Sequence, residues 1–312
     1  MILYSVVLIL KLWYNILDIK MKGMCKLFSN KRVAAIHDLS GIGRCSLTVI
    51  LPILSVMGVQ CCPVPTAILS THTGGFGDIE LRDLTDYTIP ALNHYKKLGE
   101  KFDCIYSGFL ASTGQIDHCL DFFNSYPNSL KVVDPVMGDH GKPYRTCTKE
   151  LCERMIELVS IADVITPNLT ETAILLGEKY PTSPMTSAQT KSWLVRLSEK
   201  GPNIIVITGI VLADGTNCNV GYDKKRNSFW KVVCDYVPVS YPGSGDIFSS
   251  VLVGGLLKGD SLPIAINRAT SFTEIAIKTT YSYSTETRYG IMIESSLSWL
   301  AQNQILRDYE TL

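Results

Sequence analysis

The run Gly243-Ser244-Gly245-Asp246 combines the residue types that an anion site with an adjacent base requires. Because glycine has no Cβ, Gly243 and Gly245 let the backbone turn tightly and approach a ligand closely. The apolar segment that follows predicts a helix, whose unpaired N–H groups and positive dipole end would face an anion such as phosphate. A carboxylate is unsuited to holding phosphate, but Asp246 beside the anion is placed to accept a proton. The motif therefore predicts phosphoryl transfer to a hydroxyl group.

Asp246 has a second interpretation, as the N-cap residue of the predicted helix. The flanking glycines and the acids at other strand ends favour the catalytic role. An unperturbed aspartate has a pKa near ~3.9, so we expect Asp246 to be ionised at neutral pH.

The chain around this motif alternates short apolar runs with longer amphipathic stretches, which indicates βα units and a mostly parallel sheet. Strands are expected at 32–37, 59–66, 103–107, 131–134, 163–166 and 203–208, with an antiparallel pair near 218–223 and 228–235. Helices are expected at 45–57, 81–98, 114–126, 148–160, 169–177, 187–200, 246–258 and 261–280. No repeat or linker interrupts the pattern, so residues 31–312 are expected to form a single domain.

Polar segments follow the predicted strands, at the edge where ligands of open α/β sheets bind. These segments are His37-Asp38, Thr71–Gly74, Ser107-Gly108, Asp134-Pro135, Thr166–Asn168 and Thr208-Gly209. Their shared position predicts one cleft along a single edge of the sheet.

Two of these segments carry groups that suit Mg²⁺. Asp134 and Asp139 follow a buried strand, and carboxylates near a phosphate site favour Mg²⁺, although an aspartate that caps a turn is the alternative. Asn168 and Glu171 lie three residues apart on one helical face. Their arrangement suits either contacts to metal-bound water or an ordinary helix start, and both remain open.

His72 precedes a glycine-rich stretch. A histidine here is compatible with ligand binding and equally with satisfying a turn. Gly74, Gly75 and Gly77 predict a mobile connection that would serve as a substrate flap.

Several other chemistries fit the sequence poorly. Residues 41–46 begin like a dinucleotide fingerprint, but Ser46 replaces its last glycine and no acid follows ~20 residues later. A P-loop motif is absent from the sequence. The 29 basic and 29 acidic residues balance, which does not favour a nucleic-acid partner. The ten cysteines form no C-x-x-C pair, so we expect free thiols in a reducing cytoplasm rather than a zinc site.

The first residues form an apolar segment. Its uninterrupted part, residues 2–10, is shorter than the ~20 residues that a membrane span requires, and the flanks do not favour a secretory signal. We expect residues 1–30 to be a dispensable extension, or the product of an upstream start with Met21 or Met24 as the true one. No stable membrane association is expected.

Taken together, these residues resemble the ribokinase-like superfamily, and specifically its pyridoxal/pyridoxamine kinase branch, over residues 31–290. Residues 243–246 are similar to the superfamily's G-[TS]-G-D signature. The segments that match the branch in order and spacing are 36–40, 70–74, 107–109, 134–139 and 166–171. The resemblance implies a three-layer α/β/α fold with a central, mostly parallel sheet.

On the acceptor side, the resemblance implies that Asp38 and Thr73 contact the polar groups of the pyridine ring, and His72 is a candidate for the same site. Many vitamin B6 kinases have serine where this chain has Asp38. That difference bears on the preference among pyridoxal, pyridoxamine and pyridoxine.

On the phosphate side, the resemblance implies an anion hole at Gly243, Ser244 and Gly245 with Asp246 as the catalytic base. The residues that it assigns to Mg²⁺, to the phosphates or to the nucleotide are Asp134, Asn168, Glu171, Thr208 and Gly209. The loop from Asp139 to Tyr144 would fold over ATP.

The expected function is therefore transfer of the ATP γ-phosphate to the 5′-hydroxyl of a B6 vitamer, in salvage of pyridoxal 5′-phosphate. The resemblance also implies a cytoplasmic homodimer and admits a monovalent cation beside Mg²⁺. One alternative is a hydroxymethylpyrimidine or sugar kinase of the same superfamily. A second is a catalytically silent protein that binds a B6 vitamer or a nucleotide.

Overall fold

The computed structural model describes residues 30–235, 237–302 and 308–312, and residues Arg32–Leu312 form one compact unit. The predictions about the N-terminal segment fall on residues 1–29, outside the described residues. Within the described ranges, no helix combines the length and apolar character that crossing a bilayer requires.

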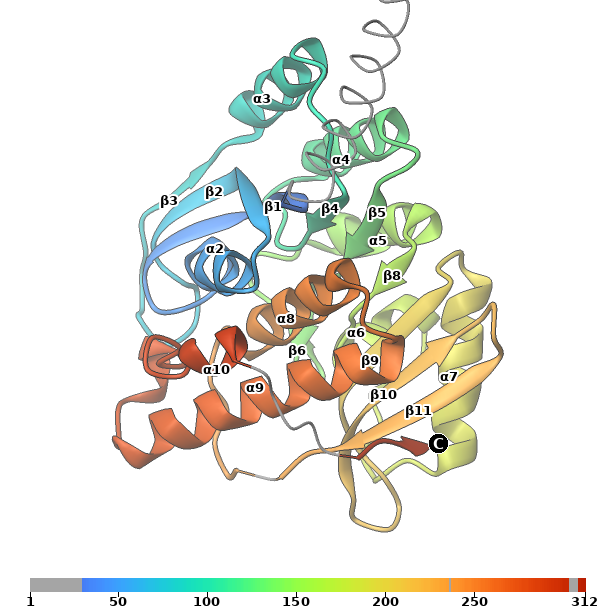
Figure 1. Ribbon diagram of the computed structural model, residues 1–312. Helices are drawn as coiled ribbons and strands as arrows, with labels where there is room; N and C mark the ends of the chain where they lie inside the picture. The colour runs from blue at the N-terminus through green and yellow to red at the C-terminus, as the bar shows by residue number, and fades with distance from the viewer. Residues whose placement is uncertain (1–29, 236, 303–307) are drawn as a thin grey trace, which may run out of the picture. The chain divides into compact units, whose positions relative to one another are not determined.

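One sheet runs through the unit in the strand order β12-β11-β10-β9-β8-β5-β4-β1-β2-β3 (Figure 1). Its strands are β1 (Arg32–Ile42), β2 (Gln60–Thr71), β3 (Leu81–Asp83), β4 (Cys104–Ser107), β5 (Leu130–Val133), β8 (Val164–Ile165), β9 (Ile204–Val211), β10 (Asn217–Asp223), β11 (Ser228–Val233) and β12 (Glu310–Thr311). The central strands from β2 to β9 run parallel, whereas β3 and the strands from β10 to β12 pair antiparallel with their neighbours. The predicted sheet, including its antiparallel pair, is confirmed.

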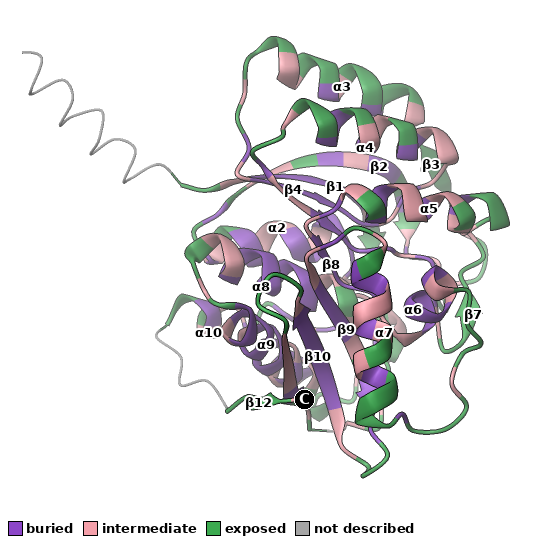
Figure 2. Ribbon diagram, turned by 90° about the vertical axis from the view of Figure 1, so that its right-hand side faces the viewer, coloured by how far each residue is buried: buried purple, intermediate pink, exposed green. Residues whose placement is uncertain are grey.

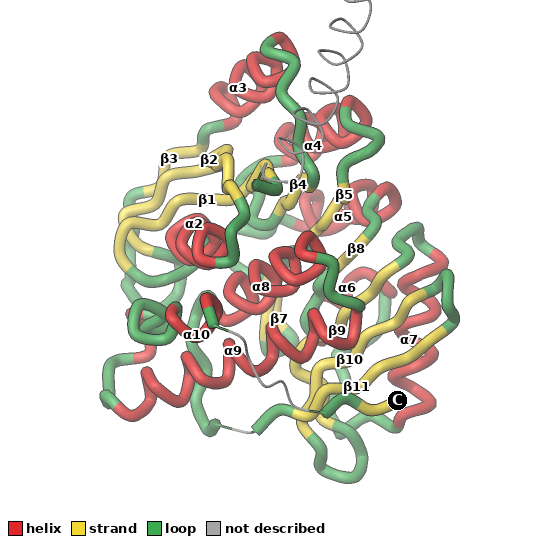
Figure 3. The backbone as a smooth tube through the Cα atoms, in the orientation of Figure 1, coloured by secondary structure: helices red, strands yellow, loops and turns green. Residues whose placement is uncertain are grey.

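Helices cover both faces of this sheet (Figures 2 and 3). They are α2 (Leu47–Val56), α3 (Thr85–Lys97), α4 (Thr113–Ser125), α5 (Lys149–Ile161), α6 (Leu169–Leu176), α7 (Ser187–Glu199), α8 (Ser244–Lys258), α9 (Leu262–Ser282) and α10 (Ser298–Ala301). Successive residues of a strand point to opposite faces, so Val33 and Ala35 join the core under α2, α8 and α9. Ala34 and Ile36 join the core under α4, α5 and α7. The result is the expected three-layer α/β/α fold.

The first two strands are longer than the periodicity predicted, because they continue pairing as far as Ile42 and Thr71. Residues 81–83 were expected to begin a helix, but they form β3, which pairs with the edge of β2. The helix α3 begins only at Thr85. The pairing of β3 with β2 overrides the helical pattern of residues 81–83, because the edge of β2 would otherwise present unpaired backbone groups.

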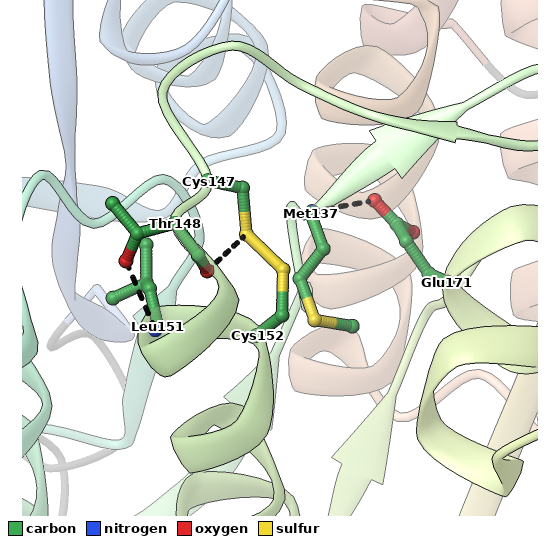
Figure 4. The surroundings of a disulfide bond; sticks show 6 residues. All are labelled: Met137, Cys147, Thr148, Leu151, Cys152 and Glu171. Atoms are coloured by element: carbon green, nitrogen blue, oxygen red, sulfur yellow. Dashed lines mark hydrogen bonds between the residues drawn. A yellow bond between two sulfur atoms is a disulfide. The ribbon is translucent and has the colours of Figure 1, made fainter.

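Cys147 and Cys152 form a disulfide, with their Cα atoms 6.3 Å apart (Figure 4). The prediction that the cysteines are free thiols is therefore wrong at these two positions. Thr148 caps α5 with its side chain, and the first turn of the helix brings the flanking cysteines together. Cys104 and Cys119 are buried free thiols, as expected, and burial raises the pKa of Cys119 to about 12.

Phe122 lies fully buried in the layer formed by α4. Phe122→Ala should lower the free energy of unfolding by about 3–5 kcal/mol, because it removes a ring from a packed core. Tyr283→Ala is the control, since Tyr283 is 62% exposed and its loss should stay within about 0.5 kcal/mol. Urea denaturation measures both, and equal losses would contradict the assigned core.

Candidate active site

The start of α8 carries the anion-binding motif. Gly243 is the N-cap residue, with φ 82, a left-handed conformation that favours glycine. A Cβ at this position would lie 2.1 Å from the carbonyl oxygen of Arg44. The glycine therefore permits both the turn into α8 and its close approach to the loop after β1. The first N–H groups of the helix, from Ser244 and Gly245, have no intrahelical acceptor and suit an anion.

Asp246 lies in the first turn of α8 and is not its N-cap, so the capping interpretation of this residue is wrong. Its Oδ2 accepts a hydrogen bond of 2.9 Å from the backbone N–H of Ser46. Ser46 precedes α2 and has φ 49, which is uncommon for a residue other than glycine. Sequence reasoning missed Ser46, because nothing in the spacing links it to Asp246.

The pKa of Asp246 is raised to about 8, first by burial of its carboxyl group and then by the nearby charge of Asp134. Asp38 adds to the same effect, whereas the Ser46 hydrogen bond opposes it. The expectation of a carboxylate ionised throughout the neutral range therefore does not describe the ligand-free protein. The physical reason is desolvation together with like-charge repulsion.

Asp134 follows β5 and is buried. The hydroxyl of Ser249 donates to Asp134 Oδ2 at 3.0 Å, and its oxygen lies 2.9 Å from Oγ1 of Thr166. Burial raises the pKa of Asp134 to about 7, and these hydroxyls oppose the shift. Sequence reasoning also missed Ser249, whose only signal was a hydroxyl within an apolar helix.

Asn168 and Glu171 form a capping box at the start of α6, so the helix-start interpretation is confirmed. The Glu171 carboxyl accepts from the backbone N–H groups of Asn168 at 2.8 Å and Met137 at 3.1 Å, the latter drawn in Figure 4. The amide of Asn168 also donates to the carbonyl oxygen of Gly138 at 2.8 Å. Burial raises the pKa of Glu171, and the charge of Asp134 adds to it.

These contacts also hold the hairpin of β6 (Gly138–Asp139) and β7 (Lys142–Pro143) against α6. The N–H of Gly141 donates to Thr170 Oγ1 at 2.8 Å. Tyr144 follows the hairpin and is partly exposed, yet burial and the charges of Glu171 and Asp139 raise its pKa. The predicted loop over the nucleotide thus begins beside the acidic residues.

Within the described ranges, no group of three or more histidine, cysteine, aspartate or glutamate side chains is arranged to hold a metal ion. Asp134 and Glu171 nevertheless lie close enough for the charge of one to raise the pKa of the other. Mg²⁺ commonly binds through one or two carboxylates, together with substrate phosphates and water. The pair therefore fits Mg²⁺ that arrives with a nucleotide, and fits a closed protein cage poorly.

Thr208 and Gly209 lie on β9 at the same edge. Thr208 forms a parallel bridge with Asn168. Gly209 has φ 70, and its N–H donates at 3.0 Å to the side chain of Asn219, which in turn donates to Thr270 at 2.9 Å. The strand end is therefore held by buried polar contacts.

Asp38 lies where the pairing of β1 with β2 shifts register, between His37 and Leu39. Such an irregularity redirects a side chain. Asp38 is buried and accepts at 2.9 Å from the hydroxyl of Ser40, and burial raises its pKa. The neighbouring His37 is fully buried, and burial lowers its pKa to about 3, whereas burial raises the pKa of Asp38.

His72 and Thr73 follow β2. Both ring nitrogens of His72 have protein partners: Nδ1 accepts from Gly74 N–H at 3.0 Å, and Nε2 lies 2.6 Å from the carbonyl oxygen of Arg288. These bonds support the turn interpretation of His72. Thr73 is partly exposed at the start of the glycine-rich stretch. Ligand binding by either residue stays a prediction.

The fit of Gly243 against Arg44 can be tested directly. Gly243→Ala should lower stability by about 1–3 kcal/mol and turnover by about 10²-fold. Alanine is strained at φ 82, and its Cβ would clash with the Arg44 carbonyl oxygen at 2.1 Å, which would displace the start of α8. Gly245→Ala is the matched comparison, since its Cβ would meet nothing within 4 Å and should leave stability unchanged or raised. Thermal unfolding of the two variants measures the difference. Equal stability would contradict the close approach.

Comparison with known proteins identifies the family to which this chain belongs. The family model described as phosphomethylpyrimidine kinase matches residues 51–291. A crystal structure of a protein from Bacteroides thetaiotaomicron, provisionally assigned as a phosphomethylpyrimidine kinase and crystallised with pyridoxal, is 44% identical, covers 91% of this chain and 100% of that chain, and has a TM-score of 0.87.

Two further relatives extend the comparison. Pyridoxal kinase from Lactobacillus plantarum is 29% identical, covers 87% of this chain and 97% of that chain, and has a TM-score of 0.80. The chloroplastic thiamine biosynthetic bifunctional enzyme TH1 of Arabidopsis thaliana is 27% identical over 73% of this chain, but this chain spans only 42% of that enzyme. The extent of the family match and the 44% identity show that the chain belongs to the phosphomethylpyrimidine kinase family, within the ribokinase-like superfamily.

Proposed function

We propose that this protein is an ATP-dependent pyridoxal/pyridoxamine kinase, which phosphorylates the 5′-hydroxyl of a B6 vitamer in salvage of pyridoxal 5′-phosphate. The observation that carries the proposal is the position of Asp246, in the first turn of the helix that Gly243 caps. Burial and the charges of Asp134 and Asp38 raise the pKa of its carboxyl group there. The relative crystallised with pyridoxal and the pyridoxal kinase of Lactobacillus plantarum support the choice of acceptor.

In the proposed reaction, Asp246 accepts the proton of the acceptor hydroxyl as its oxygen attacks the γ-phosphorus. A pKa of about 8 makes the carboxylate a stronger base than an exposed aspartate. Positioned acid–base catalysis of this kind contributes ~10²–10⁴-fold. The N–H groups of Ser244 and Gly245 stabilise the charge on the transferred phosphoryl group.

Asp134 and Glu171 are the residues that would hold Mg²⁺ with the nucleotide. The ion would supply charge neutralisation at the phosphates. Asn168, Thr208, Gly209 and Tyr144 would contact ATP. The hydroxyl of Ser249, which also lies beside that of Thr166, would orient the Asp134 carboxyl toward the ion.

Asp38 and Thr73 would contact polar groups of the vitamer ring, with His72 shaping the same side through its fixed hydrogen bonds. A homodimer, a cytoplasmic location and a monovalent cation complete the proposal. These three parts rest on the resemblance to pyridoxal kinases.

A second function, phosphorylation of hydroxymethylpyrimidine, is favoured by the family match and by the thiamine biosynthetic relative. It uses the same chemistry on a different ring. A catalytically silent binding protein is disfavoured, because Asp246 retains both its place in α8 and its bond to Ser46.

The acceptor can be identified by a coupled ADP assay with pyridoxal, pyridoxamine, pyridoxine, hydroxymethylpyrimidine and ribose. We expect Mg²⁺-dependent turnover, abolished by EDTA, with the highest kcat/KM for pyridoxal or pyridoxamine. A higher kcat/KM for hydroxymethylpyrimidine would favour the second function. Ligand binding without ADP formation would reject both.

The role of Asp246 predicts opposite effects of Asp246→Asn on activity and stability. Turnover should fall ~10²–10⁴-fold. In the wild type, kcat/KM should rise with pH towards about 8, since only the ionised carboxyl is a base. The Asp246 carboxyl keeps its proton to a higher pH in the folded protein than in the unfolded chain. Its contribution to the free energy of unfolding is therefore lost as pH rises from ~3.9 through about 8.

Replacing Asp246 with asparagine removes the titrating carboxyl group but keeps an oxygen that can accept the hydrogen bond from the Ser46 N–H. Asp246→Asn should therefore be more stable than the wild type at pH 8, and the difference should shrink at pH 4. Denaturant unfolding at the two pH values measures it. Full turnover in this variant would contradict the base assignment.

A further inference from the structure

The glycine-rich segment 73–80 contacts the 3-10 turn η1 (Thr287–Tyr289), which lies about 200 residues later in the chain, through Phe76 and Gly75. The guanidinium of Arg288 lies 5.5 Å from the ring centre of Phe76 and 5.3 Å from that of Tyr289. The two rings meet edge to face, with centroids 5.7 Å apart. These distances fit cation–π and aromatic contacts. Phe76 is therefore the point at which the tip of this segment is attached.

The start of the segment is attached to the same turn through His72, the residue that precedes it. His72 Nε2 donates to the carbonyl oxygen of Arg288 at 2.6 Å, and its ring packs edge to face on Phe76 with centroids 5.0 Å apart. Gly75 has φ 82, and a Cβ there would lie 3.1 Å from Cβ of Arg288. The segment therefore contacts Arg288 through side chain, backbone and a glycine that permits close approach.

The opposite side of η1 is joined to the loop that supports Asp246. Arg44 N–H donates to the carbonyl oxygen of Tyr289 at 3.3 Å, and the Arg44 side chain pairs with Glu294 at 2.8 Å. Gly290 has φ 72, and a Cβ there would lie 2.8 Å from Arg44 N. The turn thus has one face on segment 73–80 and the other on the loop before α2.

We propose that Arg288 is a positioning residue that latches segment 73–80 closed over the acceptor side of the site. The segment follows directly after His72, whose backbone N–H donates to the carbonyl oxygen of Ile42 at 3.3 Å. Ile42 ends β1, the strand that carries Asp38, so the segment adjoins the acceptor residues. A closed segment excludes water, which would otherwise compete with the acceptor hydroxyl. The identity of the acceptor rests on the proposed function, whereas the latch itself does not.

An alternative is that Arg288 acts only through its ion pair with Glu286, at 2.8 Å. The Glu286 side chain is 64% exposed, and exposed pairs contribute little. Glu286→Gln is therefore a matched control: it removes the pair and leaves the guanidinium over both rings. Arg288→Lys keeps a cation and is the conservative variant.

The first measurement is amide hydrogen exchange in the ligand-free protein. Arg288→Ala should speed exchange of residues 73–80 about two- to tenfold, as expected for loss of cation–π contacts. Glu286→Gln should leave the exchange unchanged and Arg288→Lys should restore part of the protection. Phe76→Leu keeps Arg288 and should speed exchange in the same residues, which guards against a folding defect in the alanine variant. Wild-type exchange in both Arg288→Ala and Phe76→Leu would overturn the latch.

The second measurement is the amount of ADP formed per phosphorylated acceptor. Arg288→Ala should raise this ratio and the acceptor KM, with little change in the KM for ATP. An unchanged ratio together with unchanged acceptor KM would also overturn the proposal. If the wild type phosphorylates no B6 vitamer, the proposed function fails, while the exchange experiment still decides the latch.

Discussion

Strands β1 and β5 and helices α6 and α8 bring four desolvated carboxyl groups close together, and the donors around them offset their mutual repulsion. Asp134 and Asp38 both raise the pKa of Asp246, and Asp134 does the same to Glu171. Each carboxyl receives donors that oppose this effect, such as the N–H of Ser46 and the hydroxyl of Ser249. Buried carboxyls without such donors would be protonated more strongly, because burial penalises their charged forms.

This crowding also links ligand binding to the protonation of the base. A cation held by Asp134 would replace repulsion with attraction, and so would favour the ionised form of Asp246. By linkage, loss of the Asp246 proton favours binding of the cation to the same degree. Under the proposed function, burial and nearby charges would keep Asp246 partly protonated in the ligand-free protein, and a cation held by Asp134 would favour its ionised form. Lower stability of the empty site is the expected counterpart of this arrangement.

The sequence predicted the features that depend on local period and composition. Alternation of apolar runs identified the parallel strands, and a glycine pair before an apolar helix identified Asp246. Contacts between distant segments left no periodic signal: the bond from Ser46 to Asp246, the hydroxyl of Ser249 on Asp134, and the pairing of β3 with β2. The raised pKa of Asp246 was missed for the same reason, since it depends on burial and on nearby charges that only the fold brings about.

The loop from Gly43 to Ser46 serves both the base and the latch, but through separable contacts. Its attachment to α8 is the close approach of Arg44 to Gly243 and the N–H of Ser46 on Asp246. Its attachment to η1 and the residues after it uses the backbone and side chain of Arg44, whereas the latch contacts Phe76 through Arg288. Opening segment 73–80 would break the contact of Arg288 with Phe76 and leave these bonds in place. If the proposed latch operates, Asp246 would keep its position while the acceptor enters, which is the order of events that a kinase excluding water requires.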